Sequence, residues 1–110
     1  MKSATIIRFA TGLLCLFPLI SQAIETYTLN IKDHKFAPAE ITIPADTKVK
    51  LLVKNLDATP EEFESYEMHR EKIIRGNSQA VIFIGPLKAG SYPFFGEFNP
   101  KSAKGRIVVK

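Results

Sequence analysis

Acidic residues gather in one short part of the sequence. Between residues 57 and 71, six acids stand against the single base Arg70; they are Asp57, Glu61, Glu62, Glu64, Glu67 and Glu71. Carboxylates held close together raise one another's pKa, and a bound cation relieves their repulsion. Their oxygens suit iron better than cuprous copper. Blocks of like charge are most often solvated surface, so this pattern alone leaves both a cation site and a plain acidic surface open.

Two other places in the sequence offer metal-ligating side chains. Met68 and His69 are adjacent and supply a thioether and an imidazole, which are donor types that bind copper. Met68 is also a good filler of irregular core gaps, and that is the simpler interpretation. His34 lies in a short polar stretch before Phe36, where hydrogen bonding within a turn explains it as well as ligation does.

β-Strands must position these residues, because apolar and polar side chains alternate along most of the chain. The alternation runs through residues 26–31 and, except at Leu52, through residues 48–54, which is the period of a half-buried strand. Ile41 and Ile43 continue it. Further strands are predicted at residues 72–75, 79–84, 91–95 and 105–110. The pattern predicts an all-β fold, an antiparallel β-sandwich. Residues 60–70 stay open, since their glutamates and Met68 also have helical spacing.

The first 23 residues have the layout of a secretory signal. Lys2 and Arg8 precede an apolar stretch at residues 13–20, and small residues follow at Ser21 and Ala23. The uncharged run of residues 9–24 is shorter than the roughly 20 residues that a membrane-spanning helix needs. We therefore predict a signal peptide at residues 1–23 and one domain at residues 24–110, which is exported to the periplasm and not embedded in the membrane.

This predicted mature domain excludes several classes of function. Cys15, the only cysteine, leaves with the signal, so the domain has no disulfide, thiolate ligand or cysteine nucleophile. Ser65 has no recognisable triad partner, and no hydrolase or transferase constellation is present. Without Lys2 and Arg8 the domain carries 13 basic and 11 acidic side chains. Its net charge of +2 gives no argument for binding nucleic acid or anionic lipid.

The C-terminal stretch resembles the copper loop of cupredoxins. Residues 92–109 follow the pattern Y-x-F-x-C-x-x-H-x-x-x-M-x-G-x-I-x-V, in which Cys, His and Met hold a blue copper ion. The framework residues are Tyr92, Phe94, Gly105, Ile107 and Val109. At the three ligand positions stand Gly96, Asn99 and Ala103, none of which offers a thiolate, an imidazole or a thioether. The resemblance implies a Greek-key, cupredoxin-like sandwich that has lost the blue copper site.

The N-terminal half resembles cupredoxins too. Phe36-x-Pro38-x-x-Ile41 precedes a strand that ends in Asn55, and in cupredoxins this strand leads to the first His ligand. Counting onward, the resemblance places Glu61 at that ligand position. It also implies that Glu61 lies near the loop that contains Glu97.

More narrowly, the run Thr59-Pro-Glu-Glu-Phe-Glu-Ser65 is similar to cupredoxin-like periplasmic proteins that accompany bacterial high-affinity iron permeases, including the N-terminal domain of EfeO-type proteins. The resemblance covers nearly all of the mature chain. The group commonly has His where this chain has Asn99. From the resemblance and the acidic run we predict a metal site formed by Glu61, Glu64, Glu97 and His69, with weaker candidates at Glu62, Met68, His34 and Asn99.

Two functions are consistent with these residues. The first is a periplasmic accessory that binds iron or copper and assists its oxidation or its delivery to a membrane iron permease or that permease's periplasmic iron-binding partner. The second is a metal-free interaction module, because the former copper positions lack ligands. In either case Glu61, Glu62, Glu64 and Glu97 are expected to crowd and raise at least one pKa, so that Glu61→Gln stabilises the metal-free domain at neutral pH.

Overall fold

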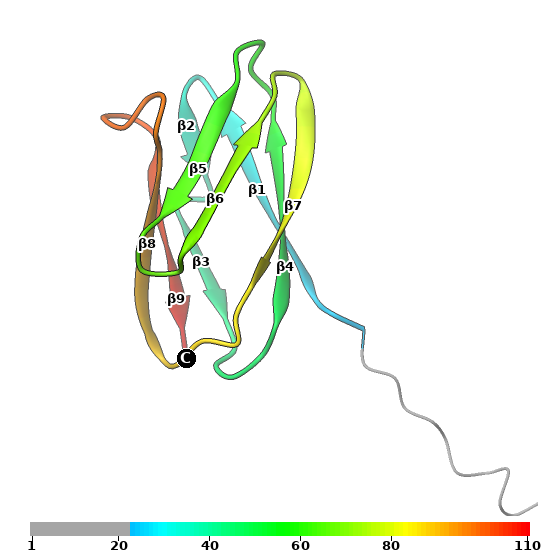
Figure 1. Ribbon diagram of the computed structural model, residues 1–110, viewed down its shortest axis with the longest axis vertical. Coiled ribbons are helices and arrows are strands. Elements are labelled where there is room, and N and C mark those ends of the chain that lie inside the picture. Colours follow the sequence, from blue (N-terminus) through cyan, green and yellow to red (C-terminus); the bar gives the residue numbers. More distant parts are fainter. Residues whose placement is uncertain (1–22) are drawn as a thin grey trace, which may run out of the picture.

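Nine β-strands make up the part of the chain that the computed structural model describes, residues 23–110 (Figure 1). In chain order they are β1 (Thr26–Lys32), β2 (Lys35–Ala37), β3 (Glu40–Ile43), β4 (Val49–Asn55), β5 (Glu61–Ser65), β6 (Arg70–Ile74), β7 (Ser78–Ile84), β8 (Gly90–Gly96) and β9 (Lys104–Val109). Within residues 23–110 no helix is long and apolar enough to cross a membrane. Apart from Ala23, the predicted signal peptide lies outside the described residues.

The strands form two sheets that pack as layers (Figure 1). The four-stranded sheet has the order β2-β1-β4-β7, and the five-stranded sheet has the order β3-β9-β8-β5-β6. Each sheet contains one parallel pair, β1 with β4 and β3 with β9. The predicted all-β sandwich is confirmed. Its sheets are mixed, however, rather than purely antiparallel as the strand pattern implied.

Burial follows the alternation of the sequence. Along β4, every second residue from Val49 to Asn55 is buried, and the residues between them are half-buried. Three aromatic rings meet in the core: Phe63 stacks on Phe94 with ring centroids 4.9 Å apart, and Phe36 meets Phe94 edge-on at 5.1 Å. Among the described residues, every member of the apolar core lies between Leu29 and Val109. Residues 24–110 therefore contain a complete core and both sheets.

The ambiguous stretch at residues 60–70 is a β-hairpin and not a helical turn. β5 pairs antiparallel with β6, and Ser65 lies opposite Arg70 at the hairpin's closed end. The Ser65 hydroxyl donates to the Pro93 carbonyl at 2.8 Å and accepts the Met68 N–H at 3.2 Å. Met68 is buried in the core, which confirms its interpretation as core filler. The sequence left this stretch open because Glu61, Glu64, Met68 and Glu71 have helical spacing, whereas β5 turns Glu61 inward and Glu62 and Glu64 outward.

The aromatic cluster should be a large source of stability. Phe63 is fully buried, so Phe63→Ala leaves a cavity and should lower the free energy of unfolding by about 3–5 kcal/mol. Phe98→Ala is the matched control, because the Phe98 side chain is 47% exposed. Urea unfolding of residues 24–110 measures both. Equal losses in the two variants would contradict this placement of the core.

Candidate functional site

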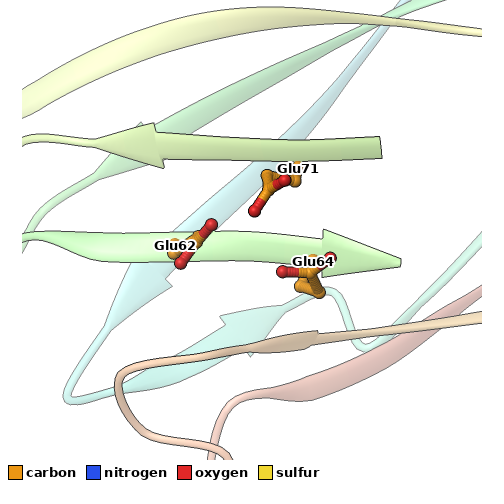
Figure 2. A group of neighbouring side chains, drawn as sticks. All are labelled: Glu62, Glu64 and Glu71. Carbon is orange, nitrogen blue, oxygen red and sulfur yellow. The ribbon is translucent and has the colours of Figure 1, made fainter. Parts of the chain in front are cut away.

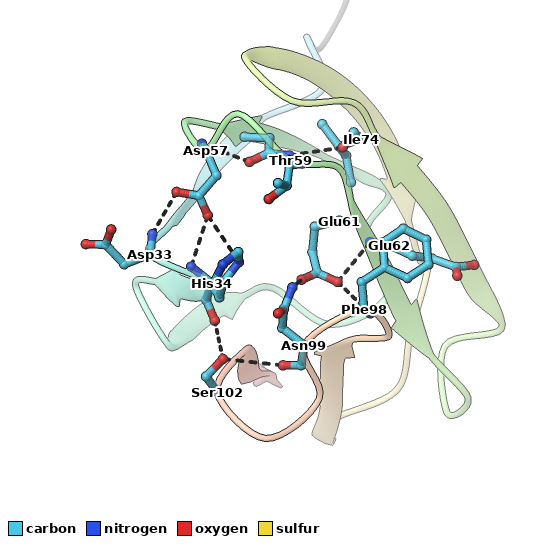
Figure 3. A network of polar contacts seen from close by, with 11 residues as sticks. Asp33, His34, Asp57, Thr59, Glu61, Glu62, Ile74, Phe98, Asn99 and Ser102 are labelled. Carbon is cyan, nitrogen blue, oxygen red and sulfur yellow. Dashed lines mark hydrogen bonds and ion pairs between the residues drawn. The ribbon is translucent and has the colours of Figure 1, made fainter.

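The four positions of the copper pattern meet at one end of the sandwich. Within the loop between β8 and β9, the Gly96 N–H donates to the Ala103 carbonyl at 2.8 Å. The Asn99 amide donates to Glu61 at 2.6 Å (Figure 3). A Cβ placed on Gly96 would lie 2.6 Å from the Glu61 carboxyl carbon and 2.7 Å from the Ala103 Cβ. Residues that are far apart in the sequence are therefore neighbours here, as the resemblance implied.

The Glu61 carboxylate fills the space between these positions. Its side chain is 1% exposed. One carboxylate oxygen accepts the N–H groups of Glu62 at 3.0 Å and Phe98 at 2.8 Å, and the other accepts the Asn99 amide (Figure 3). A carboxylate can only accept hydrogen bonds, and here both of its oxygens have donors. These four residues do not fit a blue copper ion, since they supply neither sulfur nor imidazole and the carboxylate occupies the space.

Hydrogen bonds extend from this carboxylate across the end of the sandwich (Figure 3). The Ser102 hydroxyl joins the Asn99 loop to the turn between β1 and β2, because it donates to the His34 carbonyl at 2.7 Å. Asp33 and His34 form that two-residue turn with φ angles of 52° and 60°, the left-handed geometry that matches the twist of a hairpin. Asp57 in turn accepts their N–H groups at 2.8 and 3.0 Å.

The environment of Asp57 accounts for His34 without a metal. The N–H of His34, helped by that of Asp33, lowers the pKa of the Asp57 carboxyl below its usual range and outweighs the opposing effect of desolvation. The His34 ring lies beside the same carboxylate, with Nδ1 3.7 Å from Oδ2. The hydrogen bonds that His34 makes in this turn come from its main chain, and its ring stands beside the Asp57 carboxylate. Its role as a ligand stays a prediction.

Asn55 holds the loop that leads to Glu61, and the sequence analysis gave it no such role. Its side-chain amide donates to the carbonyls of Thr59 at 2.8 Å and Ile74 at 3.1 Å, and its amide oxygen accepts the Asp57 N–H at 3.0 Å. A signal was present in the sequence, because Asn55 continues the inward-facing positions of β4. A polar residue at such a position must find partners when it is buried.

The outward face of β5 carries a separate group of acids. Glu62, Glu64 and Glu71 offer carboxylate oxygens that all lie within 4.8 Å of one another (Figure 2). Glu64 is directly opposite Glu71 in the β5–β6 hairpin. Glu97 lies on the other side, where its N–H donates to the Glu62 carbonyl at 2.8 Å. We call Glu62, Glu64, Glu71 and Glu97 the acidic face.

The pKa values of Glu62 and Glu64 on this face are raised. A hydrogen bond to the Glu71 carboxyl, then desolvation, and then the charges of Glu71, Glu64 and Glu97 raise the pKa of Glu62 above its usual range. Desolvation and the charges of Glu71 and Glu97 raise the pKa of Glu64. Of the four glutamates expected to crowd together, Glu62 and Glu64 lie among other acids, whereas Glu61 faces the interior.

The predicted ligand set is only partly gathered. Glu64 and His69 line the same shallow, open hollow together with Glu71, and Glu97 adjoins Glu62. Glu61 faces the interior instead. It also begins β5, whereas His69 follows the end of that strand, so the two residues are separated by about 13 Å of strand. Sequence reasoning did not include Glu71 in the site, because the register that places it opposite Glu64 was not recognised.

Removing the acceptor at position 61 should destabilise the domain. Glu61→Met keeps the length of the side chain but leaves the partly buried N–H groups of Glu62 and Phe98 without this acceptor, and should lower the free energy of unfolding by about 2–4 kcal/mol. Glu61→Gln should cost less, because the Asn99 amide can turn over and accept. The stabilisation expected for Glu61→Gln from sequence is thus reversed. Glu64→Met is the control, because Glu64 faces outward. Chemical denaturation in the presence of chelator measures the free energy of unfolding of both variants. Equal losses in Glu61→Met and Glu64→Met would contradict this prediction.

Relieving the acidic face should stabilise the metal-free domain in a pH-dependent way. The raised pKa of Glu62 means that the folded state holds this proton more readily than the unfolded chain, so the folded state loses stability as pH rises through about 4.3 and then through the folded value. Glu62→Gln should therefore raise stability at neutral pH and give no gain below about pH 4. The control Glu40→Gln removes an ion pair with Arg106 at 2.9 Å and should give no such gain. Denaturation with chelator at both pH values tests this, and a pH-independent effect of Glu62→Gln would contradict it.

Solved structures share this architecture. Auracyanin A, a "blue" copper protein of Chloroflexus aurantiacus, superposes with a TM-score of 0.68 over 80% of this chain and 100% of its own, at 15% identity. The metal-binding domain of the Cu(I)-exporting P-type ATPase CopA of Streptococcus pneumoniae gives 0.69 over 83% and 90%, at 17% identity. A copper-binding protein solved in its apo form gives 0.71 over 83% and 92%, at 14% identity. At these identities the likeness shows a common fold.

Sequence comparison gives the family. An uncharacterized protein of Rickettsia prowazekii (strain Madrid E) is 46% identical over 81 residues, which cover 74% of this chain and 65% of that protein. The matched segment thus spans slightly less than two thirds of the relative's length. The sequence model of the cupredoxin-like domain matches residues 5–109. Together with the two-layered fold and the convergence of Glu61, Gly96, Asn99 and Ala103, this match shows that the chain belongs to the cupredoxin-like domain family.

Proposed function

We propose that this domain is an exported, cupredoxin-like metal-binding accessory of an iron-uptake system, which takes up a cation at its acidic face. The observation that carries the proposal is the grouping of the Glu62, Glu64 and Glu71 carboxylates within 4.8 Å of one another on two paired strands. The resemblance of residues 59–65 to iron-permease-associated proteins supports the biological setting. The copper-binding proteins that share its fold support a role in handling metal.

The donor set favours iron over cuprous copper. Carboxylate oxygens are hard donors, which suit ferric and ferrous ions. After a hydrogen bond to Glu71 and desolvation at Glu62, and after desolvation at Glu64, the charges of neighbouring acids also raise the pKa values of both residues, and a bound cation would relieve that repulsion. His69, on the rim of the hollow that Glu64 and Glu71 line, adds a borderline nitrogen donor. Anionic oxygens stabilise the ferric state relative to the ferrous state, which is the direction an oxidation step would need.

The openness of the acidic face suits delivery better than storage. Glu62 and Glu64 are half-buried and Glu71 is exposed, so water can complete the coordination of a bound ion. An ion held in this way can exchange with a second site on another protein. We therefore infer that the receiving partner is a membrane iron permease or its periplasmic iron-binding protein, which would approach along β5 and β6.

A second function, a metal-free interaction module, is favoured by a different observation. The Glu61 carboxylate stands where the cupredoxin pattern places metal ligands, and hydrogen bonds occupy both of its oxygens. In this second function, the hydrogen-bonded Glu61 carboxylate, which we call the carboxylate brace, holds β5 to the β8–β9 loop in place of a metal ion. The acidic face then docks onto a partner without any ion.

Calorimetric titration of residues 24–110 separates the two functions. With ferrous ion under anaerobic conditions, ferric citrate or cupric ion, at least one should bind with micromolar affinity. Glu62→Gln combined with Glu64→Gln should weaken that binding by roughly tenfold or more, because it removes two anionic ligands. Glu40→Gln is the control, since it neutralises an exposed acid at the opposite edge of the same sheet.

The possible outcomes assign the site. Absence of micromolar binding for every ion would eliminate the metal-binding function and leave the interaction module. An effect of His34→Ala as large as that of the double variant would move the site to the Asp33-His34 turn. A metal site that still requires Glu61 would show that the brace opens on binding.

A further inference from the structure

The two sheets differ sharply in the charges that they carry. The strands β1, β2 and β4 contain four lysines, and no strand of this sheet, β7 included, contains Asp, Glu or Arg. The strands of the other sheet contain acids and bases together: five glutamates, of which Glu61 is buried, and the four bases Arg70, Lys72, Lys104 and Arg106. The small net charge inferred from the sequence therefore conceals a sheet whose strands carry lysine as their only charged residue. This composition makes the outer surface of the four-stranded sheet a candidate for recognising an anionic partner.

The register shows how that surface is arranged. Lys50 lies between Thr26 and Phe83, and Leu52 lies between Thr28 and Val81. In the next row Lys54 lies between Asn30 and Gln79, and beyond it Lys32 pairs with Lys35. These residues alternate with the buried positions of their strands, so all of them belong to the outer face.

An exposed apolar strip lies among the lysines. Val81 is 45% exposed and Phe83 is 42% exposed, although both lie in a regular strand. The Lys48 ammonium stands 4.8 Å from the centre of the Phe83 ring, and that of Lys50 stands 6.0 Å away. The aromatic ring and the cations thus form one surface, which we call the lysine face: Lys32, Lys35, Lys48, Lys50, Leu52, Lys54, Val81 and Phe83.

We propose that the lysine face docks the domain onto an anionic lipid bilayer. A bilayer supplies phosphate charges that are not fixed in position, so flexible lysine side chains can neutralise them without matched geometry. Phe83 and Val81 can enter the boundary between the headgroups and the acyl chains, where aromatic and aliphatic side chains favour peripheral binding. This inference does not depend on the metal site, which lies on the other sheet.

The composition of the face argues for lipid over a protein partner. Specific protein interfaces are enriched in Arg and depleted in Lys, because the guanidinium forms directed pairs with carboxylates. The lysine face has the opposite bias. A second copy of this chain could in principle present its acidic face to the lysine face. However, these two faces belong to opposite layers of one molecule, so such stacking would not close and would continue as an open chain.

Docking in this orientation also has a geometric result. The acidic face belongs to the opposite sheet, so it would point away from the bilayer. Anionic lipid attracts the lysine face and repels the acidic face, and both effects favour the same orientation. A domain held in this way would expose its glutamates to soluble partners beside the membrane.

Vesicle flotation with residues 24–110 tests the proposal without the apolar N-terminal segment. At low salt the domain should bind vesicles that contain about one third phosphatidylglycerol in phosphatidylcholine, and should bind at least roughly tenfold more weakly to phosphatidylcholine alone. Lys50→Gln combined with Lys54→Gln should weaken binding to the anionic vesicles roughly 10- to 30-fold. The control Lys101→Gln with Lys104→Gln removes the same net charge outside the lysine face. Thermal unfolding confirms that all variants are folded.

Several results would overturn the inference. These are equal binding to neutral and anionic vesicles, no binding to either, or equal losses in the two lysine double variants. Sedimentation velocity tests independently whether the lysine face binds a second copy of the chain. Concentration-dependent association of the protein alone, abolished by Lys50→Gln with Lys54→Gln, would assign the lysine face to a second copy of the chain. Because none of these measurements involves a metal, their failure leaves the proposed metal-binding function untouched.

Discussion

A buried carboxylate must be surrounded by donors, and this requirement at Glu61 organises one whole end of the sandwich. Its oxygens accept hydrogen bonds from the N–H groups of Glu62 and Phe98 and from the amide of Asn99. These bonds link β5 to the β8–β9 loop. That loop then closes on itself, since the Ala103 N–H donates to the Asn99 carbonyl at 2.9 Å. In the cupredoxin pattern that residues 92–109 resemble, the ligands of a copper ion stand at these positions. Here the hydrogen-bonded acid makes the connection.

Alternation along β5 lets adjacent residues have unrelated tasks. Glu61 faces the interior, and both of its carboxylate oxygens accept hydrogen bonds. Glu62 faces outward beside other acids, and its pKa is raised by the Glu71 hydrogen bond, by desolvation and by neighbouring charges. A single strand thus carries a structural acid and a candidate binding surface, one residue apart. Because the side chains point to opposite faces, a change at one position need not disturb the other.

The sequence was sufficient to predict the fold and to predict that Glu61 lies near the loop between β8 and β9. It was not sufficient to predict the direction of the Glu61 side chain. Alternating apolar residues in β1 and β4 and the framework around Gly96 indicated the sandwich correctly. The β5–β6 hairpin was left open, because Glu61, Glu64, Met68 and Glu71 have helical spacing, whereas strand pairing places Glu61 and Glu64 on opposite faces of β5. Without that register, Glu61 was grouped with Glu64, and the opposition of Glu64 and Glu71 was invisible. Whether the acidic face binds a cation is a matter of affinity, which neither pattern nor register determines.

The close approach of Gly96 to the Glu61 carboxyl group constrains the evolutionary routes open to this protein. Any side chain at position 96 would collide with the acid and with Ala103, so a cysteine could be placed there only after position 61 had become smaller. Shortening Glu61 first would leave partly buried N–H groups without this acceptor. Each single step is therefore unfavourable although the combined change need not be, which is strong epistasis between two residues in contact. A lineage that adopted the carboxylate brace would tend to keep it, even where selection for copper returned.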